Sequence, residues 1–125
     1  MGVVSIPIPP SANAIWRIVS PRMKRPFITR SQEYLDWLAD AVAAIKCNGI
    51  GLAVLPARIA ITIRGGKGWR ANRDIDNVAK PVMDALVLAG RIPDDSTQFV
   101  HSVELRYAAP IPKQVATCVV EYETE

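Results

Sequence analysis

The feature that most limits the possible folds is an alternating apolar segment at residues 54 to 64, VLPARIAITIR. Ile59, Ile61 and Ile63 are each followed there by Ala, Thr or Arg. A period of two is typical of a β-strand with one apolar face. Because an apolar face must be buried against a second layer, the rest of the chain has to supply a cover for it.

Two segments with helical periodicity are the expected cover. The first runs from about residue 31 to residue 48 and is ended by Gly49. The second runs from about residue 77 to residue 89 and is ended by Gly90. Apolar residues recur three or four positions apart in both segments, so each helix presents an apolar stripe.

Three further segments are expected to be strands, at residues 3 to 8, 98 to 107 and 115 to 123. The last two are expected to form a hairpin joined by AAPIPKQ, and Pro7 favours either an edge position or a strand end for the first. The order β-α-β-α-β-β predicts one α+β domain over residues 1–125. We expect a two-layer sandwich with two helices on one face of a small mixed β-sheet.

The composition indicates a globular domain without a membrane segment. Of the 125 residues, 50% are hydrophobic, yet no apolar run is long enough to cross a bilayer. The start, MGVVSIPIPP, lacks the features of a secretory signal. Cys47 and Cys118 lack the spacing of metal ligands, so we expect two buried thiols in a reducing, cytoplasmic compartment.

Basic residues gather in two stretches of a chain whose net charge is +3. One is a long connector at residues 11 to 30, and the other follows residue 64. This distribution suggests a polyanionic partner, although ordinary solvated loops remain an open interpretation. Trp69 either stacks on an exposed base or is a buried anchor of its loop. The residues expected to contact DNA are Arg17, Arg22, Lys24, Arg25, Arg30, Lys67, Trp69, Arg70 and Arg73.

Three aspartates near the second helix are the candidate metal ligands. Asp74 and Asp76 point to the same side if the backbone is extended, with their Cα atoms roughly 6.5 Å apart. Lys80 follows Asp76 by one helical turn. Asp95 lies beyond the helix, and only a returning loop would bring it near Asp76.

These aspartates also have an ordinary structural interpretation. Asp76 and Asn77 are suited to capping the second helix, and Asp94-Asp95-Ser96 is common turn chemistry. From the residues alone, capping and metal binding both stay open. The loop GGKG at residues 65 to 68 lacks the spacing of a P-loop, so no nucleotide cofactor is expected.

The segment RDIDNVAKPVMDALVLAGRIPDDSTQ resembles the signature of the RusA family of Holliday junction resolvases. That signature is D-x-D-N-x-x-K, then D-A-L, a Gly that ends the helix, and a D-D pair. IPIPPSANAIWR is similar to the family's opening, although Ala12 and Ala14 stand where polar residues would be unsurprising. The two matching blocks cover roughly a third of the chain.

The resemblance implies a small homodimeric, Mg²⁺-dependent endodeoxyribonuclease, bacterial or phage-encoded, that acts in DNA recombination and repair. Asp74, Asp76 and Asp95 would be its metal-binding catalytic acids. Lys80 would be catalytic by stabilising the phosphate or the leaving oxygen, and Asp84 would have a supporting role. The substrate would be four-way junction DNA, cut by paired symmetric nicks through metal-assisted hydrolysis.

Two other functions stay open. One is a DNA-binding module without catalytic activity, in which the aspartates only cap and turn. The other is a related nuclease that acts on flaps or forks. Trp16 is expected to pack against the first helix, with a role as a wedge at a junction centre as the alternative.

Overall fold

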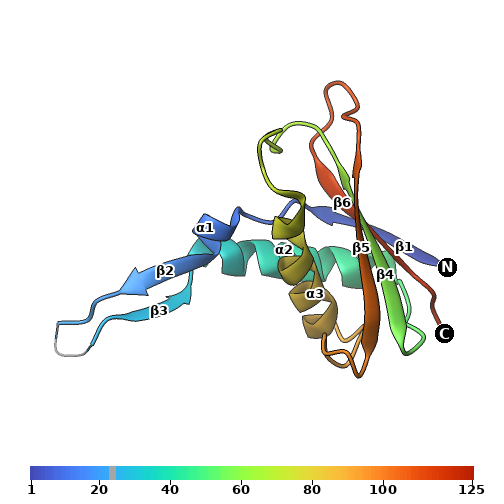
Figure 1. The fold of residues 1–125 in the computed structure, drawn as a ribbon, viewed down its shortest axis with the longest axis horizontal. Coiled ribbons are helices and arrows are strands. Elements are labelled where there is room, and N and C mark those ends of the chain that lie inside the picture. The colour runs from blue at the N-terminus through green and yellow to red at the C-terminus, as the bar shows by residue number, and fades with distance from the viewer. Residues whose placement is uncertain (23–24) are drawn as a thin grey trace.

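A four-stranded mixed sheet and two helices form the body of the protein (Figure 1). The computed structural model describes residues 1–22 and 25–125. The strands, in spatial order, are β1 (Gly2–Pro7), β6 (Thr117–Tyr122), β4 (Ala57–Arg64) and β5 (Val100–Ala108). In this sheet β4 pairs in parallel with β5 and antiparallel with β6, and β6 also pairs antiparallel with β1.

The helices α2 (Gln32–Asn48) and α3 (Ala79–Leu88) pack on one face of this sheet. Ile59, Ile61 and Ile63 of β4 are fully buried beneath them, whereas Arg58 is exposed on the other face. The predicted two-layer α+β architecture is therefore confirmed. Pro7 is the last residue of β1, and β1 is an edge strand of the sheet, as expected.

Residues at both ends of α2 explain where this helix begins and where it ends. Ser31 precedes α2, and its hydroxyl oxygen accepts a hydrogen bond from the Tyr34 N–H at 3.1 Å. Gly49 ends α2 in the left-handed conformation, with φ of 79°, which a glycine adopts without steric cost. A short 3-10 turn, η1 (Ile75–Val78), directly precedes α3 and continues into it.

The expected hairpin between the last two strands is wrong. β4 lies between β5 and β6, so the two strands that follow each other in sequence are not neighbours in the sheet. This placement gives the most apolar strand a hydrogen-bonded partner on both edges. The loop between β5 and β6 instead passes beside Gly66, where a Cβ atom would overlap the Gln114 carbonyl oxygen.

Residues 11 to 30, expected to be a connector, contain regular structure. They form a short helix, α1 (Ala12–Ile15), and a two-stranded antiparallel sheet of β2 (Trp16–Val19) and β3 (Phe27–Arg30). We call this two-stranded sheet the arm, because it projects away from the body (Figure 1). Its base is held to α2, since the Ser31 N–H donates to the Ile15 carbonyl at 2.7 Å.

The two cysteines are free and lie in different surroundings. Cys118 is buried in the core, where desolvation raises the pKa of its thiol to about 12. Cys47 is exposed, so the expectation that both thiols are buried is wrong for this residue. Within the described part of the chain, no helix has the length and apolar character needed to cross a membrane.

Candidate functional site

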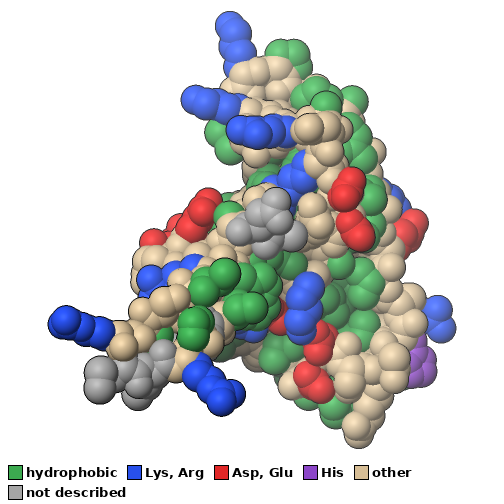
Figure 2. Space-filling model, turned by 60° about the vertical axis from the view of Figure 1, so that its left-hand side comes forward, with side chains coloured by type: hydrophobic (Ala, Val, Ile, Leu, Met, Phe, Trp, Pro, Cys, Tyr) green, Lys and Arg blue, Asp and Glu red, His purple; other side chains and the backbone are tan. Residues whose placement is uncertain are grey.

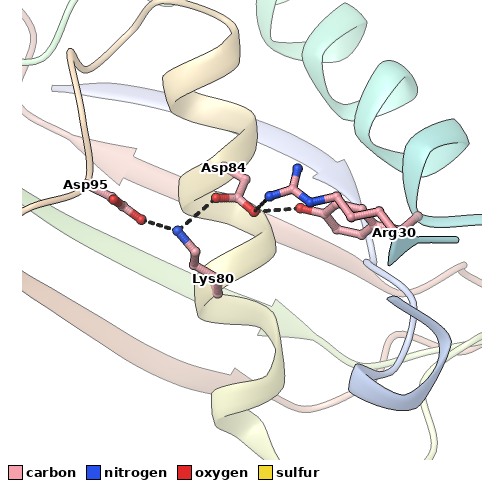
Figure 3. Close-up of polar contacts among 5 residues, drawn as sticks. Arg30, Lys80, Asp84 and Asp95 are labelled. Atoms are coloured by element: carbon pink, nitrogen blue, oxygen red, sulfur yellow. Dashed lines mark hydrogen bonds and ion pairs between the residues drawn. The ribbon is translucent and has the colours of Figure 1, made fainter. Parts of the chain in front are cut away.

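Lys80, Asp84 and Asp95 form a polar cluster beside α3 (Figure 3). The Lys80 ammonium lies 2.6 Å from Asp95 Oδ2 and 3.0 Å from Asp84 Oδ1. Lys80 and Asp84 are one helical turn apart on α3, whereas Asp95 comes from the loop that follows the helix. The loop therefore returns alongside α3, as the metal-site hypothesis required for Asp95.

Local interactions explain why this loop turns back. Gly90 adopts φ of 75°, and the Arg91 N–H donates to the Leu86 carbonyl at 2.9 Å, which closes the end of the helix. Ile92 is buried in the core and anchors the loop. The Val100 N–H then donates to the Ser96 carbonyl at 2.9 Å just where β5 begins. Asp95 is held between these two anchors.

Asp84 connects α3 to α2 and to the base of the arm. Its Oδ2 accepts a hydrogen bond from the Tyr34 hydroxyl at 2.7 Å and lies 3.6 Å from a guanidinium nitrogen of Arg30. The Asp84 side chain is only 17% exposed, so this carboxylate depends on its three donors for neutralisation. These contacts give Asp84 a structural role, because it connects three side chains from different parts of the chain.

The charges of Lys80 and Asp95 stabilise each other. The hydrogen bond to Asp95, followed by the one to Asp84, raises the pKa of Lys80. The hydrogen bond from Lys80 lowers the pKa of Asp95. Both side chains are therefore charged at neutral pH, and Asp95 is available as an anionic oxygen donor.

Asp76 and Asp95 line two different pockets that share Arg30, Lys80 and Asp84. Asp76 lines a pocket with Trp16, Arg30, Lys80 and Asp84. Asp95 lines a neighbouring pocket whose walls also include Arg30, Lys80 and Asp84. We call these two adjoining pockets the aspartate site.

Asp74 stands apart from the aspartate site. It is exposed and precedes η1, where its backbone carbonyl accepts from the Asn77 N–H at 3.3 Å. The described structure shows no side-chain cap on η1 or α3, from Asp74 or from any other residue. The capping interpretation of Asp76 is therefore wrong, since Asp76 lies inside η1 with an exposed side chain.

The donor chemistry at this site suits Mg²⁺, but the three aspartates do not converge. Mg²⁺ prefers carboxylate oxygens, and such sites typically use one or two carboxylates with water and substrate phosphates. Across residues 1–22 and 25–125, no group of three or more His, Cys, Asp or Glu side chains is placed to hold a metal. In the described arrangement the Lys80 ammonium neutralises Asp95.

The expected DNA contacts divide between the arm and the loop after β4. Figure 2 shows Lys and Arg side chains on the two parts of the molecule that project from the body. Lys24 lies outside the described residues. Arg30 is partly buried at the base of the arm, where its guanidinium lies over the rings of Trp16 and Tyr34. The exposed members are Arg17, Arg22 and Arg25 of the arm region, and Lys67 and Arg70 of the loop.

Trp69 and Arg73 are tied into the body of the protein. Trp69 is partly buried against the core, and its ring centroid lies 6.5 Å from that of Tyr107. Arg73 lies over the Trp69 ring at 4.8 Å and donates to the Pro10 carbonyl at 3.0 Å. Burial lowers the pKa of Arg73. This geometry supports the anchor interpretation of Trp69, and it gives Arg73 a structural role.

Sequence reasoning missed the contribution of Tyr34 and Arg30 to the aspartate site. From the sequence, Tyr34 is one of the apolar-stripe residues of the segment at residues 31 to 48, and Arg30 is expected only as a DNA contact. The spacing of Lys80 and Asp84, four residues apart, was an available signal for the ion pair between them. The contact of Tyr34 with Asp84, fifty residues away in sequence, had no such signal.

Two comparisons with known proteins found no match for this chain. No protein-family model matches it, and no curated protein matches it in sequence. The aspartate site therefore has to be interpreted from its own residues.

Replacing Tyr34 by Phe is expected to destabilise the fold by about 1.5–3 kcal/mol, the usual value of a hydrogen bond to a charged group. The Tyr34 ring would keep its packing against Trp37, so the change isolates the hydroxyl. Burial, followed by the hydrogen bond to Asp84, raises the pKa of Tyr34. Its stabilising effect should be complete below the ordinary tyrosine pKa of about 10 and decline above it.

The matched control is Tyr122→Phe. The Tyr122 hydroxyl donates to the neutral Gly51 carbonyl at 2.8 Å, so its loss is expected to cost only about 0.5–1.5 kcal/mol. Urea unfolding of both variants at neutral pH measures the difference. Equal costs for the two variants would contradict a charged acceptor for Tyr34.

Proposed function

We propose that this protein is a Mg²⁺-dependent, structure-selective endodeoxyribonuclease that resolves Holliday junctions by paired nicks. The observation that carries the proposal is the return of Asp95 to Lys80, one helical turn beyond Asp76. The Lys80 ammonium then contacts Asp84 and Asp95, and Asp76 and Arg30 line the adjoining pocket. Cleavage of a phosphodiester needs both an anionic metal-binding group and cationic groups for the phosphate.

Asp76 and Asp95 would hold the metal through their carboxylate oxygens, with Asp74 as a third ligand if the segment before η1 moves inward. A bound Mg²⁺ ion would supply an activated water molecule and would neutralise charge that develops on the phosphate. Asp76 is exposed, and Asp95 stays ionised because Lys80 lowers its pKa. Both carboxylates are therefore available as ligands.

Lys80 and Arg30 would bind and orient the scissile phosphate. The Lys80 side chain is 69% exposed, so its ammonium group is free to turn from Asp95 toward a phosphate oxygen. Arg30 lines both pockets of the aspartate site and is oriented by Asp84. A planar guanidinium held in this way suits recognition of a phosphate group.

A homodimer would explain why a four-way junction is the substrate. The junction has approximate two-fold symmetry, and a two-fold dimer presents two identical sites in matching orientations. Two nicks on opposed strands would then leave duplexes that a ligase can seal. A monomer, with one aspartate site, would make only one nick in each binding event.

A binding module without catalytic activity is the second candidate. The observation that favours it is the ion pair between Lys80 and Asp95, because Lys80 already occupies an oxygen that a metal ion would need. Such a module would use the same arginines to bind branched DNA. It would leave the DNA strands intact at any Mg²⁺ concentration.

Cleavage of labelled DNA substrates with Mg²⁺ separates these possibilities. We expect symmetric nicks in a synthetic four-way junction, little cleavage of a linear duplex with the same sequences, and no cleavage in chelator. Binding of the junction without nicks would support the binding module. Preference for a flap or fork over the junction would reassign the substrate to another branched DNA.

A further inference from the structure

The arm carries a row of exposed apolar side chains on one face. In its register Trp16 pairs with Arg30, and two residues further out Ile18 pairs with Ile28. Because side chains two positions apart in a strand point to the same side, these four residues share a face. Trp16, Ile18 and Ile28 are 54%, 73% and 68% exposed. A two-stranded sheet gains little stability by itself, so such an apolar face is better explained by a partner.

This apolar face begins at the wall of the aspartate site. Trp16 and Arg30, at the base of the arm, line a pocket together with Asp76 and Lys80. The Arg30 guanidinium lies over the Trp16 ring at 5.9 Å, which links the base of the arm to the charged cluster. From there the arm runs outward (Figure 1). A nucleic acid with a phosphate at the aspartate site would therefore lie along this face.

The charge of the arm favours a polyanion, and not a second copy of the chain, as the partner that covers its apolar face. Residues 12 to 30 include five basic residues and no acidic residue. Of the described members, Arg17, Arg22 and Arg25 are exposed. Arg17 pairs with Thr29 and so lies on the other face of the arm, but a second copy would still add five like charges to this region, whereas a DNA backbone would neutralise them.

We propose that the arm recognises the branch point of the DNA, with Ile18 and Ile28 inserted between base pairs that the junction leaves incompletely stacked. Aliphatic side chains form no hydrogen bonds with bases, but they fill the gap between separated base pairs in DNA-bending proteins. The exposed arginines hold the adjacent phosphates. Recognition is then by shape and not by base sequence. The inference rests on the proposed function, because it assigns the substrate contact of the same site.

Fluorescence of 2-aminopurine placed at the centre of a four-way junction tests this inference. The measurement is made in chelator, so that binding is observed without cleavage. The unmodified protein is expected to increase the fluorescence as base pairs separate, and the Ile18→Ala/Ile28→Ala variant is expected to lose most of this increase. Its Tm should stay close to that of the unmodified protein, since both side chains are exposed.

The matched control is Val3→Ala/Leu52→Ala. Both side chains are 48% exposed, and both lie near the chain ends, at the opposite end of the molecule from the arm (Figure 1). This control should increase the fluorescence as much as the unmodified protein does. Equal increases with the control and the arm variant would overturn the proposal.

Two further outcomes separate this inference from the proposed function. A fluorescence increase without nicking in Mg²⁺ supports the role of the arm and contradicts the nuclease. Nicking in Mg²⁺ without a fluorescence increase contradicts only the arm. If the arm variant instead turns a dimer into a monomer in analytical ultracentrifugation, with no change in fluorescence, a second copy covers this face and the proposal is overturned.

Discussion

Asp76→Asn is expected to slow Mg²⁺-dependent nicking of a four-way junction on the order of a thousand-fold, with junction binding unchanged or stronger. The loss follows from the several kcal/mol that metal coordination contributes to stabilising the transition state. The substitution keeps the size of the side chain and removes one negative charge from the aspartate site. Binding should not suffer, because an anionic group near the phosphate is removed.

Single-turnover nicking of a labelled junction measures this effect. Asp40→Asn is the matched control, since Asp40 is also an exposed aspartate but lies on α2, outside the aspartate site. The control should nick at the rate of the unmodified protein. Nicking by Asp76→Asn at that same rate would contradict the assignment of Asp76 as a metal ligand.

Asp95→Asn and Asp74→Asn extend the same experiment. Asp95→Asn is expected to be as inactive as Asp76→Asn, although it also removes the ion pair that holds Lys80. Asp74 lies outside the two pockets. A large loss of nicking in Asp74→Asn would mean that the segment before η1 moves inward in the active complex. Full activity of this variant would limit the protein ligands to Asp76 and Asp95.

Ile61→Ala is expected to destabilise the protein by about 2–5 kcal/mol, which is a large part of the stability of a small domain. Ile61 is fully buried at the centre of β4, and its register partners are Val120 of β6 and Leu105 of β5. Both helices cover this face of the sheet, so the neighbours have little freedom to fill the space left by the lost carbons.

Urea unfolding with an unchanged m-value measures this cost. Ile18→Ala is the control, because it makes the same substitution at a side chain that is 73% exposed on the arm. Its cost is expected to be within about 0.5 kcal/mol. A cost below about 1 kcal/mol for Ile61→Ala would contradict the central position of β4 in the core.

The features that could be predicted from the sequence are those marked by a regular spacing of apolar residues or by a residue that ends a helix. The alternating isoleucines of β4 identify a strand with one apolar face, and Gly49 and Gly90 mark the ends of the two helices. The helical segments were located to within a few residues, except that the second begins as the 3-10 turn η1. Each of these signals depends on residues a few positions apart, so no knowledge of the partner segments is needed.

The order of the strands could not be predicted in the same way. β5 and β6 are consecutive, and a hairpin is the commonest arrangement for such strands. The structure instead places β4 between them, which depends on contacts between segments about forty to sixty residues apart. The arm was missed because its exposed Ile18 and Ile28 give no pattern of burial.

By itself, the sequence determined the α+β class, the two long helices and the strands of the main sheet, together with the group of acidic residues near Lys80. Only the tertiary structure decided which of these residues meet. It brought Asp95 to Lys80 and Tyr34 to Asp84, and it left Asp74 outside the pockets that Asp76 and Asp95 line. The reason is physical, because a local pattern specifies which face a side chain occupies, whereas packing of the whole chain specifies what lies opposite that face.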